Sequence, residues 1–246
     1  MKKAVPKSKY AFLPVIMLFA GLFLAVTAFS VSAEAGRERV TSGASRMCDN
    51  TRPRTDVSAL TTKTRYIRTK SAFKLTAMHS AGERSITLGL GGGEIGYETH
   101  GKFKVMEQDG KACVSLDQVL VKFYAKPQIH IASNFKRGSC EYNAVLGHEQ
   151  KHIRTLRRFH KEYARALKKK LPEIAGKVKP SGVIPASQVE YTQNRMLEQV
   201  AAGVEAYLSK AVGVLDKRQS HVDSPSEYRR VFALCDNWNE QIVNGN

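Results

Sequence analysis

The sequence predicts an α+β protein in which a small antiparallel β-sheet is followed by two long antiparallel helices. Short segments of alternating apolar and polar residues, rich in β-branched and aromatic side chains, occupy residues 65–133. Residues 139–171 and 187–215 instead repeat their apolar side chains every three or four positions, which is the period of an α-helix. The connection between these two stretches contains proline and glycine, so the chain can turn there and return antiparallel.

Two segments precede this predicted fold. Residues 1–33 have the pattern of a secretory signal peptide: lysines without acids, a mostly apolar run, and small residues where signal peptidase reads. Cleavage is expected after Ala33 or Ala35, and because the apolar run is close to a bilayer-spanning length, an uncleaved anchor is the alternative. Residues 34–62 are polar and predict a flexible lead-in, so the folded domain is expected at residues 63–246.

Export and charge restrict the partners of the chain. The formal net charge is +17, and about +13 remains once the four lysines of the signal are removed. We expect a periplasmic or secreted protein, membrane-anchored if the signal is not cleaved. No nucleic-acid recognition motif is present, so the basic excess predicts affinity for an anionic envelope surface and no nucleic-acid partner. The oligomeric state is left open.

The mature part contains four cysteines, Cys48, Cys113, Cys140 and Cys235. An even number of cysteines in an exported protein predicts two disulfide bonds. Three pairings are possible, and the sequence does not choose between them. No C-x-x-C is present, which makes a thioredoxin-like redox site or a cysteine zinc knuckle unexpected.

Two segments of the strand region carry specific expectations. Residues 119–125 and 128–132 predict two strands joined by a tight turn at Lys126-Pro127. The stretch from Gly89 to Gly96 matches G-x-G-x-x-G, but no strand-to-helix transition follows and no Gly-Lys-Ser/Thr is present. We therefore reject a nucleotide site there and expect a hairpin tip or a flap that faces the substrate.

The first long helix begins after Ser139, a suitable N-cap residue, and Pro172 sets its far limit. Its apolar residues form one stripe: Tyr142, Val145, Leu146, Ile153, Leu156, Phe159, Tyr163 and Leu167. Glu149 and His152 fill a gap in this stripe, so both side chains are expected to face the interior, where an unpaired charge is costly. They need partners there, and a metal ion supplies them.

The residues His148-Glu149-Gln150-Lys151-His152 form an H-E-x-x-H motif inside this helix. Residues four apart lie one above the other on a helix, so both imidazoles can reach one metal ion. Such a pair is typical of zinc metallopeptidases, in which a metal-bound water of lowered pKa attacks the substrate and the glutamate acts as general base. The motif predicts Zn²⁺ held by His148 and His152, with Glu149 as the catalytic base.

A catalytic zinc site needs a third protein ligand. His160 lies about 12 Å beyond His152 along the same helix, which is too far for one metal ion. If the second helix returns antiparallel, its last part lies level with the motif. Glu205, Asp216 and His221 all fit that register.

The chain resembles a family of bacterial exported proteins, described as predicted secreted zinc-dependent proteases, that is catalogued as a domain of unknown function. The matching residues are Ser139-Cys140, Tyr142, the H-E-x-x-H motif, Tyr163-Ala164-Arg165, Asp216 and His221. The family's tail resembles Tyr-Asp-x-x-Thr-x-His-Gly, of which this chain keeps the Asp and the His. The resemblance implies a zincin-like fold with His221 as third ligand, and Asp216 as its partner or as the alternative ligand.

These observations predict an exported zinc-dependent metallopeptidase that hydrolyses peptide bonds in a peptide or protein substrate. In zincins an edge strand holds the extended substrate as one more strand, and residues 119–124 or 128–133 are the candidates here. One alternative is a metal-dependent amidase that acts on cell-wall peptides by the same chemistry. The other is a non-enzymatic basic envelope protein in which the histidines hold a structural metal.

Overall fold

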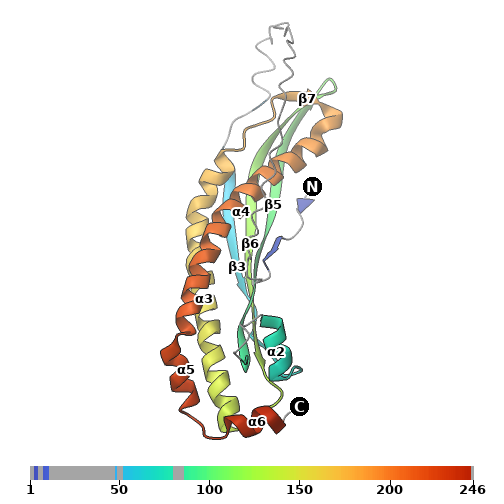
Figure 1. Cartoon of the computed structure of the whole chain (residues 1–246). Helices are drawn as coiled ribbons and strands as arrows, with labels where there is room; N and C mark the ends of the chain where they lie inside the picture. The colour runs from blue at the N-terminus through green and yellow to red at the C-terminus, as the bar shows by residue number, and fades with distance from the viewer. Residues whose placement is uncertain (1–2, 5–7, 11–47, 49–51, 80–85, 245–246) are drawn as a thin grey trace, which may run out of the picture.

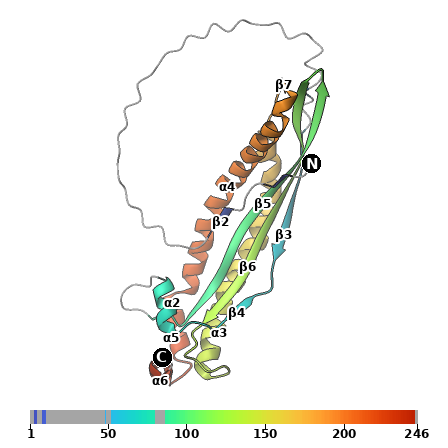
Figure 2. The same ribbon diagram turned by 90° about the vertical axis from the view of Figure 1, so that its right-hand side faces the viewer.

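The computed structural model describes residues 3–4, 8–10, 48, 52–79 and 86–244, and these residues form an α+β fold (Figures 1 and 2). Seven strands of the described residues make one sheet, and two long helices run along it. The expected α+β class is confirmed. Five helices are present in the described ranges, three of them short and not expected from the sequence.

The centre of the sheet is a long antiparallel hairpin. Strand β5 (Gly89–Gln108) pairs with strand β6 (Lys111–Ile131) from Gly89↔Ile131 to Gln108↔Lys111. Asp109 and Gly110 form the turn, with φ angles of 51° and 69°, as expected for an Asp-Gly hairpin turn. Two short strands, β1 (Lys3–Ala4) and β2 (Ser8–Tyr10), pair antiparallel with β5. They come from the predicted signal peptide, most of which lies outside the described residues.

The expectation of a purely antiparallel sheet is wrong on one side of β6. There, β3 (Arg54–Thr61) and β4 (Arg65–Ile67) pair with β6 in parallel. The chain passes through α2 (Ala72–His79) and β5 before it enters β6, and such a crossover allows parallel pairing. Strand β3 also corrects the predicted flexible lead-in, because residues 54–61 are ordered by pairing with a strand that is distant in sequence.

Residues 119–132 do not form two strands with a turn at Pro127. Residues 119–131 belong to the single strand β6, which Ala132 follows, and Pro127 pairs with Gly93 of β5. A proline is tolerated there because β3 pairing ends at Ala125 and β4 pairing begins at Gln128. Position 127 therefore needs no backbone N–H on that side of the strand.

The two long helices cover one face of the sheet. Helix α3 (Cys140–Gly176) starts at Ser139, whose Oγ accepts a 3.1 Å hydrogen bond from the Tyr142 backbone N–H. The helix continues beyond Pro172, against expectation, because Leu171, Ile174 and Ala175 remain buried in the core. A short strand, β7 (Val183–Pro185), and a 3₁₀ turn lead into α4 (Val189–Val222). Helix α4 runs back along α3, as the sequence predicted.

Two apolar clusters hold these layers together. The larger one lies between the sheet and the long helices and includes Val121, Phe123, Leu156, Leu167 and Val200. The smaller one lies at the other end of the molecule, around the short helices α2, α5 (Pro225–Phe232) and α6 (Trp238–Asn244). This smaller cluster packs beside the start of α3, where the H-E-x-x-H motif lies.

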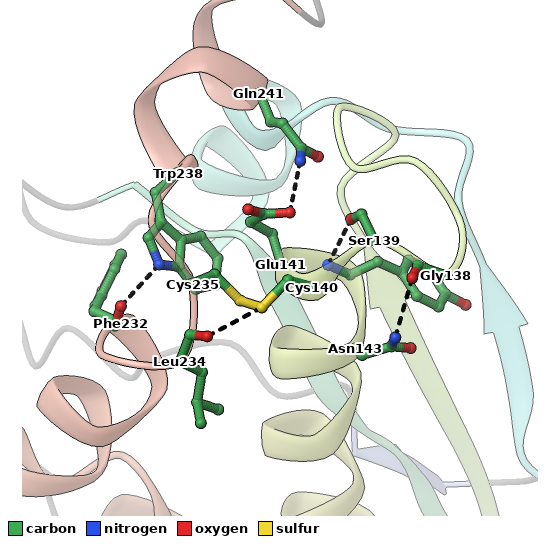
Figure 3. The surroundings of a disulfide bond; sticks show 11 residues. Gly138, Ser139, Cys140, Glu141, Asn143, Phe232, Leu234, Cys235, Trp238 and Gln241 are labelled. Carbon is green, nitrogen blue, oxygen red and sulfur yellow. Dashed lines mark hydrogen bonds between the residues drawn. A yellow bond between two sulfur atoms is a disulfide. The ribbon is translucent and has the colours of Figure 1, made fainter.

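Both pairs of cysteines form disulfide bonds, Cys48–Cys113 and Cys140–Cys235. The second bond ties the first turn of α3 to the segment between α5 and α6, where Trp238 Nε1 donates a 2.9 Å hydrogen bond to the Phe232 carbonyl (Figure 3). Two disulfides are typical of proteins that fold in an oxidising compartment. None of the helices in the described ranges combines the length and the hydropathy needed to cross a bilayer.

Candidate metal centre

His148 and His152 lie on the buried face of α3, together with Glu149, and the gap in the apolar stripe had predicted this burial for Glu149 and His152. Their exposed fractions are both 6 %, and Glu149 is 4 % exposed. The two Nε2 atoms face each other at 3.3 Å. The helical spacing thus brings two imidazole nitrogens to one point, as the sequence predicted.

The third side chain at this point is Asp223, which caps the C-terminus of α4. Its Oδ1 lies 3.2 Å from His148 Nε2 and 3.0 Å from His152 Nε2. The three ligand atoms all lie within 4.8 Å of one another. Imidazole nitrogen and carboxylate oxygen in this arrangement are ligands that a zinc ion accepts.

The hydrogen bonds of the two Nδ1 atoms determine which ring nitrogen of each imidazole carries the proton. His148 Nδ1 lies 3.4 Å from Glu227 Oε1, and His152 Nδ1 lies 2.8 Å from Gln219 Oε1. Gln219 also donates from Nε2 to the His152 carbonyl at 3.3 Å, which fixes the orientation of its amide. Both Nδ1 atoms therefore donate, and in neutral rings both Nε2 atoms present lone pairs. The Nε2 lone pairs of the two histidines and Asp223 Oδ1 thus point to one place, where a bound cation would interact favourably with all three.

Glu227 is itself held by two cations. Its Oε1 accepts from Lys151 Nζ at 2.6 Å, and Arg230 bonds both carboxylate oxygens at 2.7 and 2.9 Å. The hydrogen bonds from Arg230 and Lys151 hold the pKa of Glu227 well below its usual value. A carboxylate that is ionised at neutral pH thus lies beside the His148 ring and orients it. Lys151, an unassigned position of the motif, has a structural role in this network.

The ionisation of the three converging groups is coupled. Burial alone would lower the pKa of His148 and His152, but hydrogen bonds with Asp223 and the charge of Glu149 raise both pKa values. Burial would raise the pKa of Asp223, but its hydrogen bonds with the two histidines keep that pKa below its usual value. The site therefore favours an ionised Asp223 opposite positive charge.

The Glu149 side chain points away from Glu227 and Gln219 and lies against strand β5. Its carboxylate accepts a hydrogen bond from the Gly91 backbone N–H, and burial raises its pKa to about 7. A Cβ on Gly89 would lie 2.5 Å from Glu149 Oε1, and one on Gly91 would lie 2.5 Å from the Glu149 carbonyl oxygen. The glycine-rich stretch is therefore neither a hairpin tip nor a flap. It is the part of β5 where the backbone must touch α3.

Tyr228, from the first turns of α5, completes the polar side chains around the centre. Its hydroxyl donates a 2.9 Å hydrogen bond to Asp223 Oδ1, and its ring centroid lies 5.5 Å from that of His148. Burial, together with the Asp223 carboxylate, raises the pKa of Tyr228. The hydroxyl is thus a protonated donor at neutral pH.

A cavity of about 600 Å³ opens onto these groups. It is lined by the metal-centre residues, by residues 86–91, which lead into β5 and begin it, and by the apolar side chains of Val145, Val231 and Phe232. On the side away from β6, β5 has no strand partner among the described residues until Ile95. Residues 119–124 and 128–133, expected to form the substrate edge, lie instead within or directly after the central strand β6. The free edge beside the centre belongs to β5.

None of the three residues that the sequence offered as a third ligand lies beside His148 and His152. His221 is exposed, and its Nδ1 donates to the Lys217 carbonyl at 2.6 Å. Asp216 is exposed on the same helix. Glu205 accepts a 2.6 Å hydrogen bond from the Tyr97 hydroxyl. The structure brings Asp223 to the histidines in their place.

Asp223 was missed because α4 was expected to end near residue 215, whereas it ends at Val222. A local signal was available. Ser224-Pro225 followed by Glu227 is a capping box with proline at the first helical position, and Ser224 Oγ accepts from the Glu227 N–H at 3.4 Å. This signature marks a helix start and places Asp223 at the junction of two helices.

Comparison with family models, with curated proteins and with solved structures found no match to this chain.

Proposed function

We propose that this protein is an exported, metal-dependent peptidase that hydrolyses peptide bonds at the centre formed by His148, His152 and Asp223. The observation that carries this proposal is the convergence of two imidazole lone pairs and a carboxylate beside a buried glutamate. A histidine pair four residues apart with a glutamate after the first histidine is the arrangement that zinc hydrolases use.

Zinc is the metal that the ligand set favours, since two imidazoles and one carboxylate form a known catalytic zinc set. Three ligand groups come together among the described residues, which leaves a coordination position for water or substrate. A structural zinc site is usually closed by four protein ligands. The three-ligand set therefore supports catalysis over the non-enzymatic alternative. When bound, the metal supplies Lewis acidity to a water molecule and to the substrate carbonyl.

Each residue around the metal would have a separate role in the reaction. Glu149 would accept the proton of the attacking water and return it to the leaving amine. The Gly91 N–H would hold the Glu149 carboxylate in place. The Tyr228 hydroxyl, which donates its one hydrogen to Asp223 Oδ1 in this structure, would turn from that carboxylate to donate to the oxygen on which negative charge develops.

The substrate would bind as an extended peptide along β5 at residues 89–93, on the side where β5 has no strand partner among the described residues. It would use backbone groups other than the Gly91 N–H, which binds Glu149. The unpaired backbone groups of an edge strand accept a further strand by hydrogen bonding. One apolar side chain of the peptide would enter the cavity against Val145, Val231 and Phe232. A cell-wall peptide amidase would use the same groups and would differ only in its substrate.

The test combines metal content with hydrolysis of a mixed library of quenched fluorescent peptides. We expect about one zinc per chain in the purified mature protein and none in the His148→Ala, His152→Ala variant. Glu149→Gln should keep the metal and lose hydrolysis by about two to four orders of magnitude. Full activity of Glu149→Gln, or a metal-free wild-type protein after zinc soaking, contradicts the proposal. Cleavage of cell-wall peptides but not of the library supports the amidase.

A further inference from the structure

One face of α3 is far more basic than the rest of the described chain. Between residues 151 and 170 the helix carries nine lysines and arginines and one acid, Glu162. The neighbouring segment of residues 52–79 carries seven basic residues and one acid, Asp56. Helix α4 carries four of each sign. The positive charge is thus concentrated on one flank of the molecule.

Five of the α3 cations form a straight line on the helix surface. We call them the basic stripe: Arg154, Arg158, Lys161, Arg165 and Lys169. Spacings of three and four residues keep them within about 60° of one direction, at intervals of about 4.5 to 6 Å. The stripe is about 22 Å long. All five residues are exposed, and none has an ion-pair partner within the described part of the chain.

The two acids that could neutralise this flank are already bound to other cations. Glu162 accepts two hydrogen bonds from Arg218 of α4, at 2.7 and 3.0 Å. Asp56 of β3 pairs with Lys168 at 3.0 Å. Because α3 lies between α4 and β3 (Figure 2), these pairs occupy the two margins of the stripe. The stripe between them keeps its full positive charge.

A groove runs along one margin of the stripe, between α3 and β3. It is lined by Val57, Ala59 and Ala164 and by basic side chains, among them Lys161 and Arg165. The volume of the groove is about 390 Å³. A flexible chain can lie in such a groove, whereas a flat surface cannot enter it.

We propose that the basic stripe and this groove bind a linear polyanion, a flexible polymer that carries phosphate or carboxylate groups at short intervals. Such a chain can place one anion beside each cation of the stripe. A bilayer surface is less suited, because α3 exposes no large apolar side chain that could insert into lipid. Single-stranded nucleic acid is less suited, because the stripe offers no exposed aromatic ring for base stacking.

Short-chain inorganic polyphosphate is the probe, added to the full mature protein at several salt concentrations. With five contacts, the logarithm of the binding constant should fall with a slope of about −3.5 against the logarithm of salt concentration. The variant Arg158→Glu, Lys161→Glu, Arg165→Glu should bind at least about tenfold more weakly, with a slope near −1.4. Polyaspartate in a parallel titration shows whether carboxylate polymers bind as well as phosphate polymers.

The matched control is Arg195→Glu, Lys210→Glu, Lys217→Glu, which makes the same change in net charge on α4. It should change the affinity by less than about twofold. Equal weakening by both variants would show that only net charge matters and would overturn the site. Binding to anionic phospholipid vesicles or to single-stranded DNA without binding to polyphosphate overturns it too. The proposal does not rest on hydrolysis, so a loss of the metal centre by His148→Ala, His152→Ala should leave polyphosphate binding unchanged.

Discussion

Gly91 of β5 and Glu149 of α3 lie in direct contact. A Cβ on Gly91 would lie 2.5 Å from the Glu149 carbonyl oxygen and 2.8 Å from its Oε2. The same glycine donates its backbone N–H to the Glu149 carboxylate. The position of the proposed catalytic base is therefore set by a strand that can approach the helix only because it lacks a side chain there.

Gly91→Ala should force β5 away from α3 and disturb Glu149. We expect a loss of about 1 to 3 kcal/mol in the free energy of unfolding, typical of overpacking, and a lower rate of hydrolysis. Urea denaturation and peptide hydrolysis measure the two effects. Gly92→Ala is the matched control, because a Cβ at Gly92 meets nothing within 4 Å. Similar losses in both variants would show that the close approach of strand and helix is unimportant.

Much of the fold could be predicted from local patterns. The period of the apolar residues identified α3 and α4, and the proline and glycine in their connection indicated antiparallel packing. The parallel pairing of β3 was not predictable from the polar residues 54–61, because that pairing depends on a partner about 60 residues away. The prediction at Pro127 failed because the missing N–H falls in a gap between two partner strands.

The candidate site was predictable where one helix determines it and unpredictable where two elements meet. The spacing of His148 and His152 fixes their convergence, and the gap in the apolar stripe indicated that Glu149 and His152 are buried. Asp223 depends on where α4 ends, and helix ends are poorly marked in sequence. The outer partner Glu227 lies on α5, a helix of eight residues that gave no recognisable period.

The identity of the third ligand can be tested by three single substitutions. Asp223→Asn should weaken zinc binding by more than about 100-fold, because it removes the charge of a proposed metal ligand. His221→Ala and Asp216→Asn should leave the affinity within about twofold, since both side chains are exposed and lie outside the cluster. Competition with a chromogenic chelator measures the dissociation constants. A large loss in His221→Ala with none in Asp223→Asn would instead restore the ligand that the family resemblance implies.

Glu227 should act as a positioning residue for His148. Glu227→Ala leaves the His148 Nδ1–H without its acceptor, and zinc affinity should fall by about 10- to 100-fold. We expect kcat to fall while KM for a peptide changes little, because the substrate does not contact this carboxylate. Glu227→Gln keeps an acceptor and should recover part of the affinity.

Glu162→Ala is the control for Glu227, since it also removes a carboxylate that binds an arginine, but on the exposed surface. It should leave zinc affinity and hydrolysis unchanged. If both alanine variants reduce zinc affinity to the same extent, the effect comes from a general loss of stability.

The raised pKa of Glu149 predicts that the stability of the metal-free protein depends on pH. Its folded-state pKa is about 7 against 4.5 for an unperturbed glutamate, because the carboxyl group is buried. The folded state therefore holds a proton that the unfolded state has lost between these two values, and stability falls as pH rises through that window. The difference corresponds to about 3 kcal/mol above pH 7. Glu149→Gln, which cannot ionise, should be more stable than the wild type by about that amount at pH 8 and equally stable at pH 4. Denaturant unfolding in EDTA tests this, and a constant difference between the two proteins across the range contradicts it.

The Cys140–Cys235 bond should support the metal centre as well as the fold. It ties the first turn of α3 to the residues that follow α5, so it limits the motion of the helix that carries Glu227 and Tyr228. Replacing both cysteines by serine should cost about 2 to 4 kcal/mol of stability and should also weaken zinc binding. Removing Cys48–Cys113 should cost stability alone, because Cys113 lies at the far end of β6, opposite β7. Chelator competition on both double variants separates these outcomes. Equal zinc affinity in the two variants would mean that the centre holds α5 in place without help from the disulfide.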